Sequence, residues 1–227
     1  AQEITVPFCP ESVLSGIGHV DFMPSVWYRR NFTIPSDWKG KEVILHFGAV
    51  DYEARVWLNG KFVGRHLGGY SSFSFDITPY LKDGENTVVV YAIDDTRSGL
   101  QATGKQSTEY YSSGCEYTRT TGIWQTVWLE AVPVNHISSF RLYPNLDAGS
   151  LTVIAKVSGN TDGITLKAKA TASGKSVGEA SVPALSPSTF TINLSEVHPW
   201  EPGNGYLYDL DLVLEKDGKP IDIIKSY

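Results

Sequence analysis

Residues 54–60 are Ala54-Arg55-Val56-Trp57-Leu58-Asn59-Gly60, an alternation of apolar and polar side chains that ends in an Asn-Gly pair. Side chains point alternately to the two faces of a β-strand, so this period predicts a strand with one buried face. Asn-Gly favours the tight turn of a β-hairpin, because both residues tolerate positive φ. We therefore expect a hairpin whose second strand returns antiparallel to the first.

The same pattern recurs along the whole chain of 227 residues. Residues 164–170 also alternate apolar and polar side chains, and further turn pairs stand at Asp83-Gly84 and Asp217-Gly218. β-Branched and aromatic residues, which are common in strands, fill runs such as 87–91 and 124–128. No window carries the 3.6-residue apolar period of an amphipathic helix. The sequence therefore predicts an all-β, antiparallel protein.

The composition changes near Ala131-Val132-Pro133-Val134. Five of the six tryptophans and both cysteines lie before this point, whereas the later strands are aliphatic and rich in Ser, Thr and Lys. A chain of this length commonly forms either one large β domain or two smaller ones. We expect two domains: a jelly-roll β-sandwich over residues 1–133 and an immunoglobulin-like β-sandwich over residues 134–227.

Charge and hydropathy exclude several classes of partner. The formal net charge is -6 and the pI is near 5.4, so no basic field attracts nucleic acid or anionic lipid. No stretch reaches the roughly 18 apolar residues of a membrane-spanning helix. We therefore expect neither a nucleic-acid partner nor a membrane partner. The two cysteines, Cys9 and Cys115, are too few for a disulfide framework and are expected to be free thiols.

Motifs for catalysis or metal binding are missing from the sequence. The five histidines show no spacing on which a metal ion could close, and no nucleotide-binding or cysteine-nucleophile motif occurs. Asp94-Asp95 is the only adjacent acidic pair. Neighbouring residues of a strand point to opposite faces, so we interpret this pair as a strand end whose Asp side chains bond nearby backbone N–H groups. We expect no catalytic residue and no metal site in this chain.

One segment indicates binding. The connection of residues 94–121 is too long for an ordinary turn and is rich in Gly, Ser, Thr, Tyr and Gln. Tyrosine rings can stack on the apolar face of a pyranose, and Glu, Gln and Arg can bond its hydroxyl groups. The alternative is a loop that only packs against a neighbouring domain. Our candidate substrate-binding residues are Gln106, Tyr110, Tyr111, Glu116 and Arg119.

Several longer motifs can be compared with known families. They are WYRRNFTIP at 27–35, FGAVDYEARVWLNG at 47–60, GGY at 68–70, TGIWQTVWLE at 121–130, HPWEP at 198–202 and YLYDL at 206–210. The first four resemble the sugar-binding domain that opens the family 2 glycoside hydrolases, which include β-galactosidases, β-glucuronidases and β-mannosidases. The last two resemble the immunoglobulin-like domain that follows in the same enzymes. The resemblance extends from about Val6 to Tyr227.

The resemblance implies a retaining hydrolase whose two catalytic glutamates lie on a (β/α)8 barrel after a segment similar to residues 224–227. The sequence holds no such barrel, and the Asn-Glu pair that carries the family's acid/base glutamate does not occur in it. Glu116 and Arg119 fall where bacterial β-galactosidases have an Asp, which contacts a galactose hydroxyl and a sodium ion, and an Arg. The resemblance thus implies a substrate contact for Glu116, with Arg119 as its charge partner or orienter. It implies no cofactor for this chain, and sodium or magnesium only for the parent enzyme.

We therefore interpret the chain as the non-catalytic N-terminal part of a β-galactosidase-like family 2 glycosidase, inactive by itself. In the parent enzyme the catalytic barrel would pack on the loop of residues 94–121, carbohydrate would be the substrate, and the two domains would offer surfaces for oligomers. The start Ala1-Gln2-Glu3 is consistent with a removed export signal, so we expect a periplasmic or secreted enzyme. Two alternatives stay open: a stand-alone carbohydrate-binding module, and structural or oligomerisation domains without sugar contact.

Overall fold

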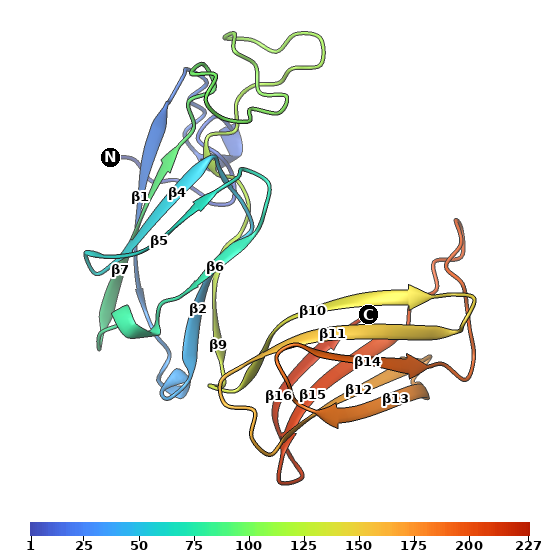
Figure 1. Cartoon of the computed structure of the whole chain (residues 1–227). Coiled ribbons are helices and arrows are strands. Elements are labelled where there is room, and N and C mark those ends of the chain that lie inside the picture. The colour runs from blue at the N-terminus through green and yellow to red at the C-terminus, as the bar shows by residue number, and fades with distance from the viewer. The chain divides into compact units, whose positions relative to one another are not determined.

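The computed structural model describes all residues from Ala1 to Tyr227. The chain forms sixteen β-strands and three short 3-10 turns and contains no α-helix, which confirms the expected all-β fold. None of its helical segments has the length or the apolar character needed to cross a membrane. Two compact units make up the chain, Ala1–Ala131 and Val132–Tyr227 (Figure 1).

The first unit is a jelly-roll sandwich of two main sheets. One sheet has the strand order β1-β7-β4-β5, the other has the order β6-β2-β9, and β3 and β8 form a separate short pair. The 3-10 turns are η1 (Val13–Ser15), η2 (Ser36–Trp38) and η3 (Thr78–Tyr80). The strands are β1 (Ser25–Thr33), β2 (Glu42–Phe47), β3 (Val50–Asp51), β4 (Glu53–Leu58), β5 (Lys61–Leu67), β6 (Phe73–Asp76), β7 (Glu85–Ile93), β8 (Gly122–Ile123) and β9 (Val127–Val132).

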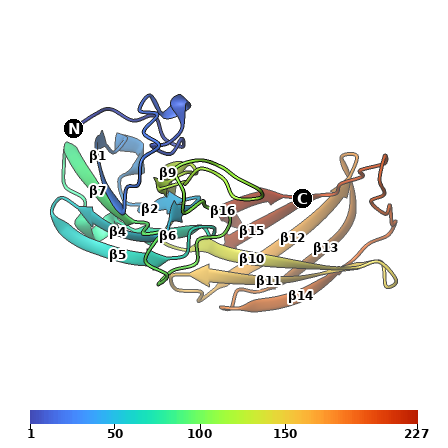
Figure 2. The ribbon, with the colours of Figure 1, turned by 90° about the horizontal axis from the view of Figure 1, so that it is seen from above.

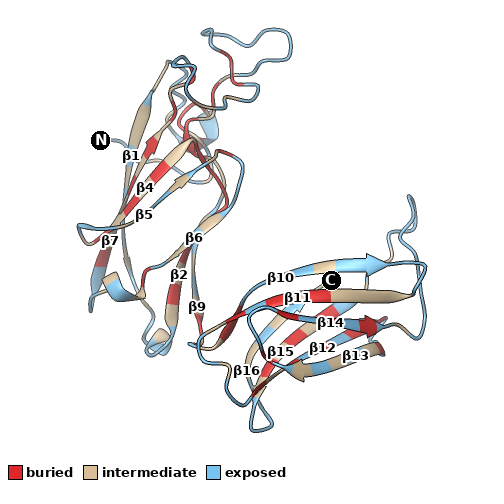
Figure 3. Ribbon diagram, viewed as in Figure 1, coloured by how far each residue is buried: buried red, intermediate tan, exposed pale blue.

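The hairpin expected from residues 54–60 is present as β4 and β5. The two strands pair antiparallel with Leu58 opposite Lys61. Asn59 and Gly60 form the turn between them with φ values of 51° and 80°, which an Asn-Gly pair adopts at little cost. The apolar residues of the alternation are buried in the core between the sheets, as Figure 3 shows for β4. The period of two therefore sets which face of the hairpin is covered.

The second unit is an immunoglobulin-like sandwich of seven strands. Its two sheets have the orders β10-β11-β14 and β13-β12-β15-β16, and Figures 1 and 2 show them as two layers. Along β12 every second residue from Ile164 to Ala172 is buried between the layers, as the alternation predicts. The strands are β10 (His136–Asn145), β11 (Ser150–Ser158), β12 (Ile164–Ala172), β13 (Lys175–Pro183), β14 (Ser188–Asn193), β15 (Asp209–Lys216) and β16 (Lys219–Ser226).

Candidate functional site

The candidate site lies at one end of the first unit, where several chain segments meet. The strand β3 ends at Asp51 and pairs with β8, and β7 is followed directly by Asp94. The loop of residues 94–121, which connects β7 to β8, lies at this end together with the segment before β1 (Figure 1). The Thr121 backbone N–H donates to the carboxylate of Glu11 at 3.2 Å, so the end of the loop is fixed to that segment.

Three carboxylates are buried at this end of the sandwich. Glu11, Asp51 and Asp94 are 6%, 2% and 3% exposed. One oxygen of Asp51 accepts a hydrogen bond from Gln106 Nε2 at 3.0 Å, and one oxygen of Asp94 accepts one from Gln101 Nε2 at 2.6 Å. The second oxygen of each aspartate has no hydrogen-bond partner within the protein. Because a buried carboxylate with an unpaired oxygen is costly in its charged form, protonation of this group is favoured.

Burial and neighbouring negative charges raise the pKa values of both aspartates. Loss of hydration raises the pKa of Asp51 to about 7, and the negative charges of Asp94 and Glu11 add to the shift. Loss of hydration also raises the pKa of Asp94 to about 6, although the hydrogen bond from Gln101 acts in the opposite direction. Asp51 is therefore partly protonated near neutral pH.

Arg119 anchors the loop from inside. It is 3% exposed, and its guanidinium group donates hydrogen bonds to the backbone carbonyls of Val20, Ser107 and Glu109. These bonds join the segment before β1 to the loop. No ion pair or hydrogen bond joins Arg119 to Glu116 in this structure, and the role of Arg119 as charge partner or orienter in the parent enzyme stays a prediction. The three carbonyls accept from the terminal nitrogens of the buried guanidinium group, its Nε has no partner, and Glu116 stays exposed to solvent.

Gln106 is the predicted site residue that reaches the buried carboxylates. It is 6% exposed, and its side-chain nitrogen donates to Asp51. Its side-chain oxygen accepts a hydrogen bond from the Thr120 backbone N–H at 2.7 Å. Gln106 therefore connects the middle of the loop both to its own end and to the sandwich.

Tyr110, Tyr111 and Glu116 lie on the exposed part of the loop. Tyr110 is 59% exposed and Tyr111 is 68% exposed. Tyr110 packs edge-on against Phe22, with ring centroids 5.2 Å apart. The backbone of Glu116 forms two hydrogen bonds with Ser113, of 3.0 and 3.2 Å, and its carboxylate side chain is exposed. The loop thus has a buried base and an exposed part that carries carboxylates and phenols, among them Glu116, Tyr110 and Tyr111.

A cavity of about 220 Å³ lies beside the base of the loop. Phe22 and Pro24 line it with apolar surface, and Asp94, Arg119 and Thr121 line it with polar groups. Each of the two charged lining residues also has a buried polar atom without a hydrogen-bond partner, one carboxylate oxygen of Asp94 and Nε of Arg119. Ligand pockets commonly measure ~300 to 1,000 Å³, so this cavity has room for water or a few ligand atoms and not for an oligosaccharide.

The structure offers no metal site. No group of three or more His, Cys, Asp or Glu side chains could hold a metal ion. Glu116 lies in an exposed turn and belongs to no cluster of such side chains, so the sodium ion that the resemblance implies for the parent enzyme stays a prediction. Cys9 and Cys115 are both free, as expected, and burial raises the pKa of the Cys9 thiol to about 11.

The burial of Glu11, Asp51 and Asp94 was not predicted from the sequence. Asp95 fits the expected strand end, since its side chain accepts a hydrogen bond from the Arg97 backbone N–H at 3.3 Å. Asp94 instead points inward and is bonded by Gln101. The sequence contained one signal for this buried carboxylate: Asp94 comes directly after the apolar run of β7, where the packed strand end can bury a side chain. The same signal is present at Asp51, which follows Val50 and ends β3.

Two adjacent stretches of the chain match models of known protein families. Residues 17–133 match the family model described as "Glycosyl hydrolases family 2, sugar binding domain", and residues 135–227 match "Glycosyl hydrolases family 2". The chain belongs to glycoside hydrolase family 2. Its two units are the sugar-binding and immunoglobulin-like domains of that family, which stand N-terminal in the family 2 enzymes.

This family 2 chain is similar to enzymes of more than one specificity. The β-galactosidase large subunit of Leuconostoc lactis is 27% identical over 202 residues, which cover 87% of this chain and 30% of the relative. A β-glucuronidase of Formosa agariphila is 33% identical over 136 residues, which cover 58% of this chain and 13% of the relative. The crystal structure of a β-glycosidase from Bacteroides vulgatus superposes with a TM-score of 0.67 at 28% identity, covering 90% of this chain and 25% of that one. The chain thus spans less than a third of the length of each.

Proposed function

We propose that this chain is the non-catalytic N-terminal part of a retaining, β-galactosidase-like enzyme, and that its loop of residues 94–121 lies at the rim of the active site. The observation that carries the proposal is the combination of a buried base and an exposed part in one long loop. Arg119 and Gln106 fix the base, while Glu116 and the two tyrosines stay open to solvent. The similarity to a β-galactosidase subunit supports a galactoside as substrate.

The exposed part of the loop has the chemistry to hold a sugar. A carboxylate can accept hydrogen bonds from two sugar hydroxyl groups, and a tyrosine ring can cover the apolar face of a pyranose. Binding residues act best when packed and hydrogen-bonded neighbours support them. The bonds of Arg119 to three carbonyls provide such support, because they tie the loop to the rest of the unit. Glu116 can therefore contact substrate from a loop that needs little further ordering.

The catalytic groups of such an enzyme must come from another part of the protein. Retaining hydrolysis uses two carboxyl groups ~5 to 5.5 Å apart, on either side of the glycosidic bond. The charge of Asp94 contributes to the raised pKa of Asp51, but the two side chains are only 3% and 2% exposed. A glycosidic bond cannot be placed between two buried side chains of this kind. A catalytic barrel packed on the loop would supply the reacting carboxylates.

The substitution Glu116→Gln in the parent enzyme tests the role of the loop. It removes the charge and keeps the shape of the side chain. Losing one charged hydrogen-bond contact to substrate is expected to lower kcat/KM for an aryl β-galactoside about ten- to a hundredfold.

Glu109→Gln is the matched control, because Glu109 is an exposed carboxylate of the same loop. Its kcat/KM is expected to stay within about twofold of the wild type, as for other exposed charges without a substrate contact. If the folded Glu116→Gln enzyme is as active as the control, Glu116 makes no substrate contact and the proposed role of the loop is wrong.

A further inference from the structure

The outer face of the sheet β1-β7-β4-β5 plays no part in the proposed function. Along β4 the buried residues Ala54, Val56 and Leu58 point into the core. Arg55 and Trp57 stand between them and therefore point outward. Strand pairing extends this outer face from β4 across β7 to β1 and across to β5.

Two neighbouring rows of the outer face combine aromatic and arginine side chains. The first row runs across β1, β7, β4 and β5 through Trp27, Tyr91, Arg55 and Arg65. The second row runs across the same strands through Arg29, Val89, Trp57 and Phe62. We name the four rings Trp27, Tyr91, Trp57 and Phe62 the aromatic platform.

The rings of the aromatic platform are held against one another; Trp27 and Phe62 are exposed, and Trp57 and Tyr91 are half-buried. Trp27 stacks on Tyr91 with ring centroids 4.2 Å apart, and lies 5.7 Å from Trp57 with an angle of 29° between the planes. Trp57 meets the edge of Phe62 at 5.5 Å. Trp27 nevertheless remains 64% exposed and Phe62 remains 52% exposed. Stacking fixes the orientation of the indoles. Binding of a partner over these rings therefore costs little further side-chain entropy.

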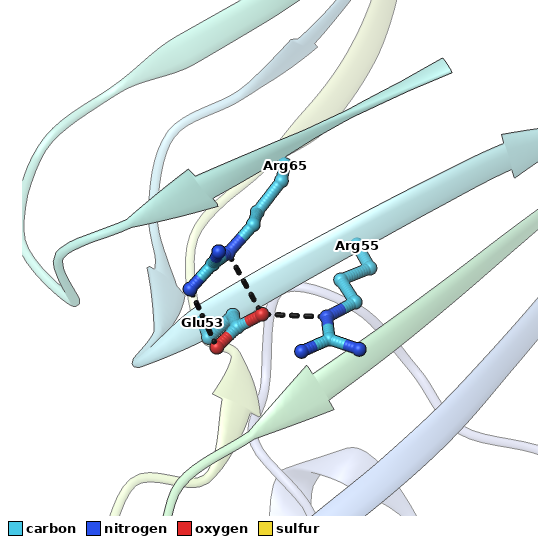
Figure 4. A network of polar contacts seen from close by, with 3 residues as sticks. All are labelled: Glu53, Arg55 and Arg65. Atoms are coloured by element: carbon cyan, nitrogen blue, oxygen red, sulfur yellow. Dashed lines mark hydrogen bonds and ion pairs between the residues drawn. The ribbon is translucent and has the colours of Figure 1, made fainter. Parts of the chain in front are cut away.

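Fixed hydrogen-bond donors stand beside the rings. The carboxylate of Glu53 accepts hydrogen bonds from Arg55 Nε at 2.5 Å and from Arg65 Nε at 2.9 Å (Figure 4). Glu53 thereby orients both guanidinium groups, and each keeps further N–H donors that Glu53 does not use. Arg29 stands next to Trp27 on β1 and is exposed. The face thus presents oriented donors next to flat apolar surface.

Size and charge decide what can occupy this face. An aromatic side chain offers ~150 to 250 Å², so the exposed parts of Trp27 and Phe62 provide roughly 200 to 300 Å². A stable protein interface needs about 800 Å² from each partner, which makes a second copy of the chain a poor fit. The net charge of -6 of the whole chain opposes the approach of a long polyanion, although the arginines make this face itself locally positive. A narrow, uncharged partner with apolar faces and many hydroxyl groups fits both limits.

We propose that the aromatic platform binds a neutral, β-linked polysaccharide chain. The apolar faces of its pyranose rings stack on Trp27 and Trp57, and its hydroxyl groups accept hydrogen bonds from Arg29, Arg55 and Arg65. Extended β-linked chains suit this site, because successive rings can follow the rows across the sheet. The site is separate from the loop of residues 94–121 and does not depend on the proposed catalytic role of the parent enzyme.

Calorimetric titration of the 227-residue chain with β-1,4-galactotetraose, cellotetraose and β-1,4-xylotetraose tests the proposal. At least one probe is expected to bind saturably at millimolar concentration. Trp27→Ala is expected to weaken that binding about tenfold or more, as for other central aromatic contacts. Trp128→Ala is the matched control and is expected to bind like the wild type, because Trp128 is 43% exposed on β9 of the other sheet.

The indole N–H signals of the wild type give a second measurement that needs no variant. On adding the probe, the NMR signals of Trp27 and Trp57 are expected to shift, and those of Trp128 and Trp200 to stay in place. The proposal is overturned if no probe binds, if folded Trp27→Ala binds as tightly as the wild type, or if the shifts fall on Trp128 instead. A dimer that Trp27→Ala abolishes, without any glycan binding, would also overturn it. None of these outcomes affects the test on Glu116, which uses the parent enzyme.

Discussion

Raising the pH from about 5 to about 8 is expected to destabilise the first unit, because Asp51 and Asp94 must then lose protons while buried. Folding raises the pKa of Asp51 from 3.8 to about 7 and that of Asp94 from 3.8 to about 6. Both carboxyl groups therefore hold a proton more tightly in the folded unit than in the unfolded chain. The free energy of unfolding consequently falls as the pH rises from 3.8 through about 7, and it levels off above that range.

The size of this loss follows from the two pKa values. Between pH ~5 and ~8 the linkage relation gives a loss of about 3 kcal/mol for Asp51 and about 1 kcal/mol for Asp94. The value for Asp51 includes the repulsion from a charged Asp94, so the loss for Asp51 is smaller wherever Asp94 is still protonated. We expect a total loss of about 2 to 4 kcal/mol, which is a large share of the ~5 to 15 kcal/mol that stabilises an ordinary domain.

Urea unfolding followed by tryptophan fluorescence at several pH values measures this loss. Five of the six tryptophans lie in the first unit, so the fluorescence reports mainly on its unfolding. Asp51→Asn and Asp94→Asn each remove one titrating group and are expected to flatten the pH dependence. Asp147→Asn, in an exposed turn of the second unit, is the matched control and is expected to keep the wild-type slope.

The test compares how the free energy of unfolding changes with pH, and not its absolute value at one pH. The amide N–H₂ that Asp51→Asn introduces meets no acceptor at the second oxygen position and can itself cost about 1 to 3 kcal/mol. A wild-type stability that stays constant or rises between pH ~5 and ~8 would refute the reasoning. An unchanged slope in the variant that carries both Asn substitutions would refute it equally.

Three further predictions concern the loop, the start of β8 and the core of the second unit. Arg119→Ala leaves three carbonyls without their donor, so limited proteolysis is expected to cut the loop of residues 94–121 several-fold faster than in the wild type. Equal cleavage rates would show that Arg119 does not anchor the loop. Gly122→Ala is expected to cost about 1 to 3 kcal/mol in urea unfolding of the first unit, since φ is +75° and a Cβ would meet the Tyr28 hydroxyl; an unchanged midpoint would show that β8 can shift. Leu212→Ala, at a fully buried position, is expected to cost the second unit about 2 to 5 kcal/mol and to leave the first unit's transition in place; a common shift would show that the units do not unfold separately.

The long strands could be predicted because each is specified by its own residues. The alternation of β4 and its Asn59-Gly60 turn, or the alternation of β12, needs no information from the rest of the chain. The pair β3 and β8 could not be predicted in this way. Each of these strands has only two residues, which is too short to show a period, and they meet across a long stretch of sequence. Only the packed sandwich brings them together.

The candidate site was predictable in its location and not in its charges. The length and composition of the loop pointed to Gln106 and Arg119, and both lie where the loop meets the rest of the unit. Glu11 bonds to Thr121, which is 110 residues away, so no local pattern could connect them. Burial then couples carboxylates that look isolated in the sequence. The exposed residues Tyr110, Tyr111 and Glu116 are placed by the structure, while their contact with a sugar is a proposal.

The central claim is that this chain supplies no catalytic group of its own. Incubation of the purified 227-residue chain with p-nitrophenyl β-galactoside and β-glucuronide measures it directly. The expected result is no release of nitrophenol above the rate in buffer, because the close pair of carboxylates in the first unit is buried away from any substrate. Turnover that disappears when Asp51 and Asp94 are both replaced by Asn would contradict this account.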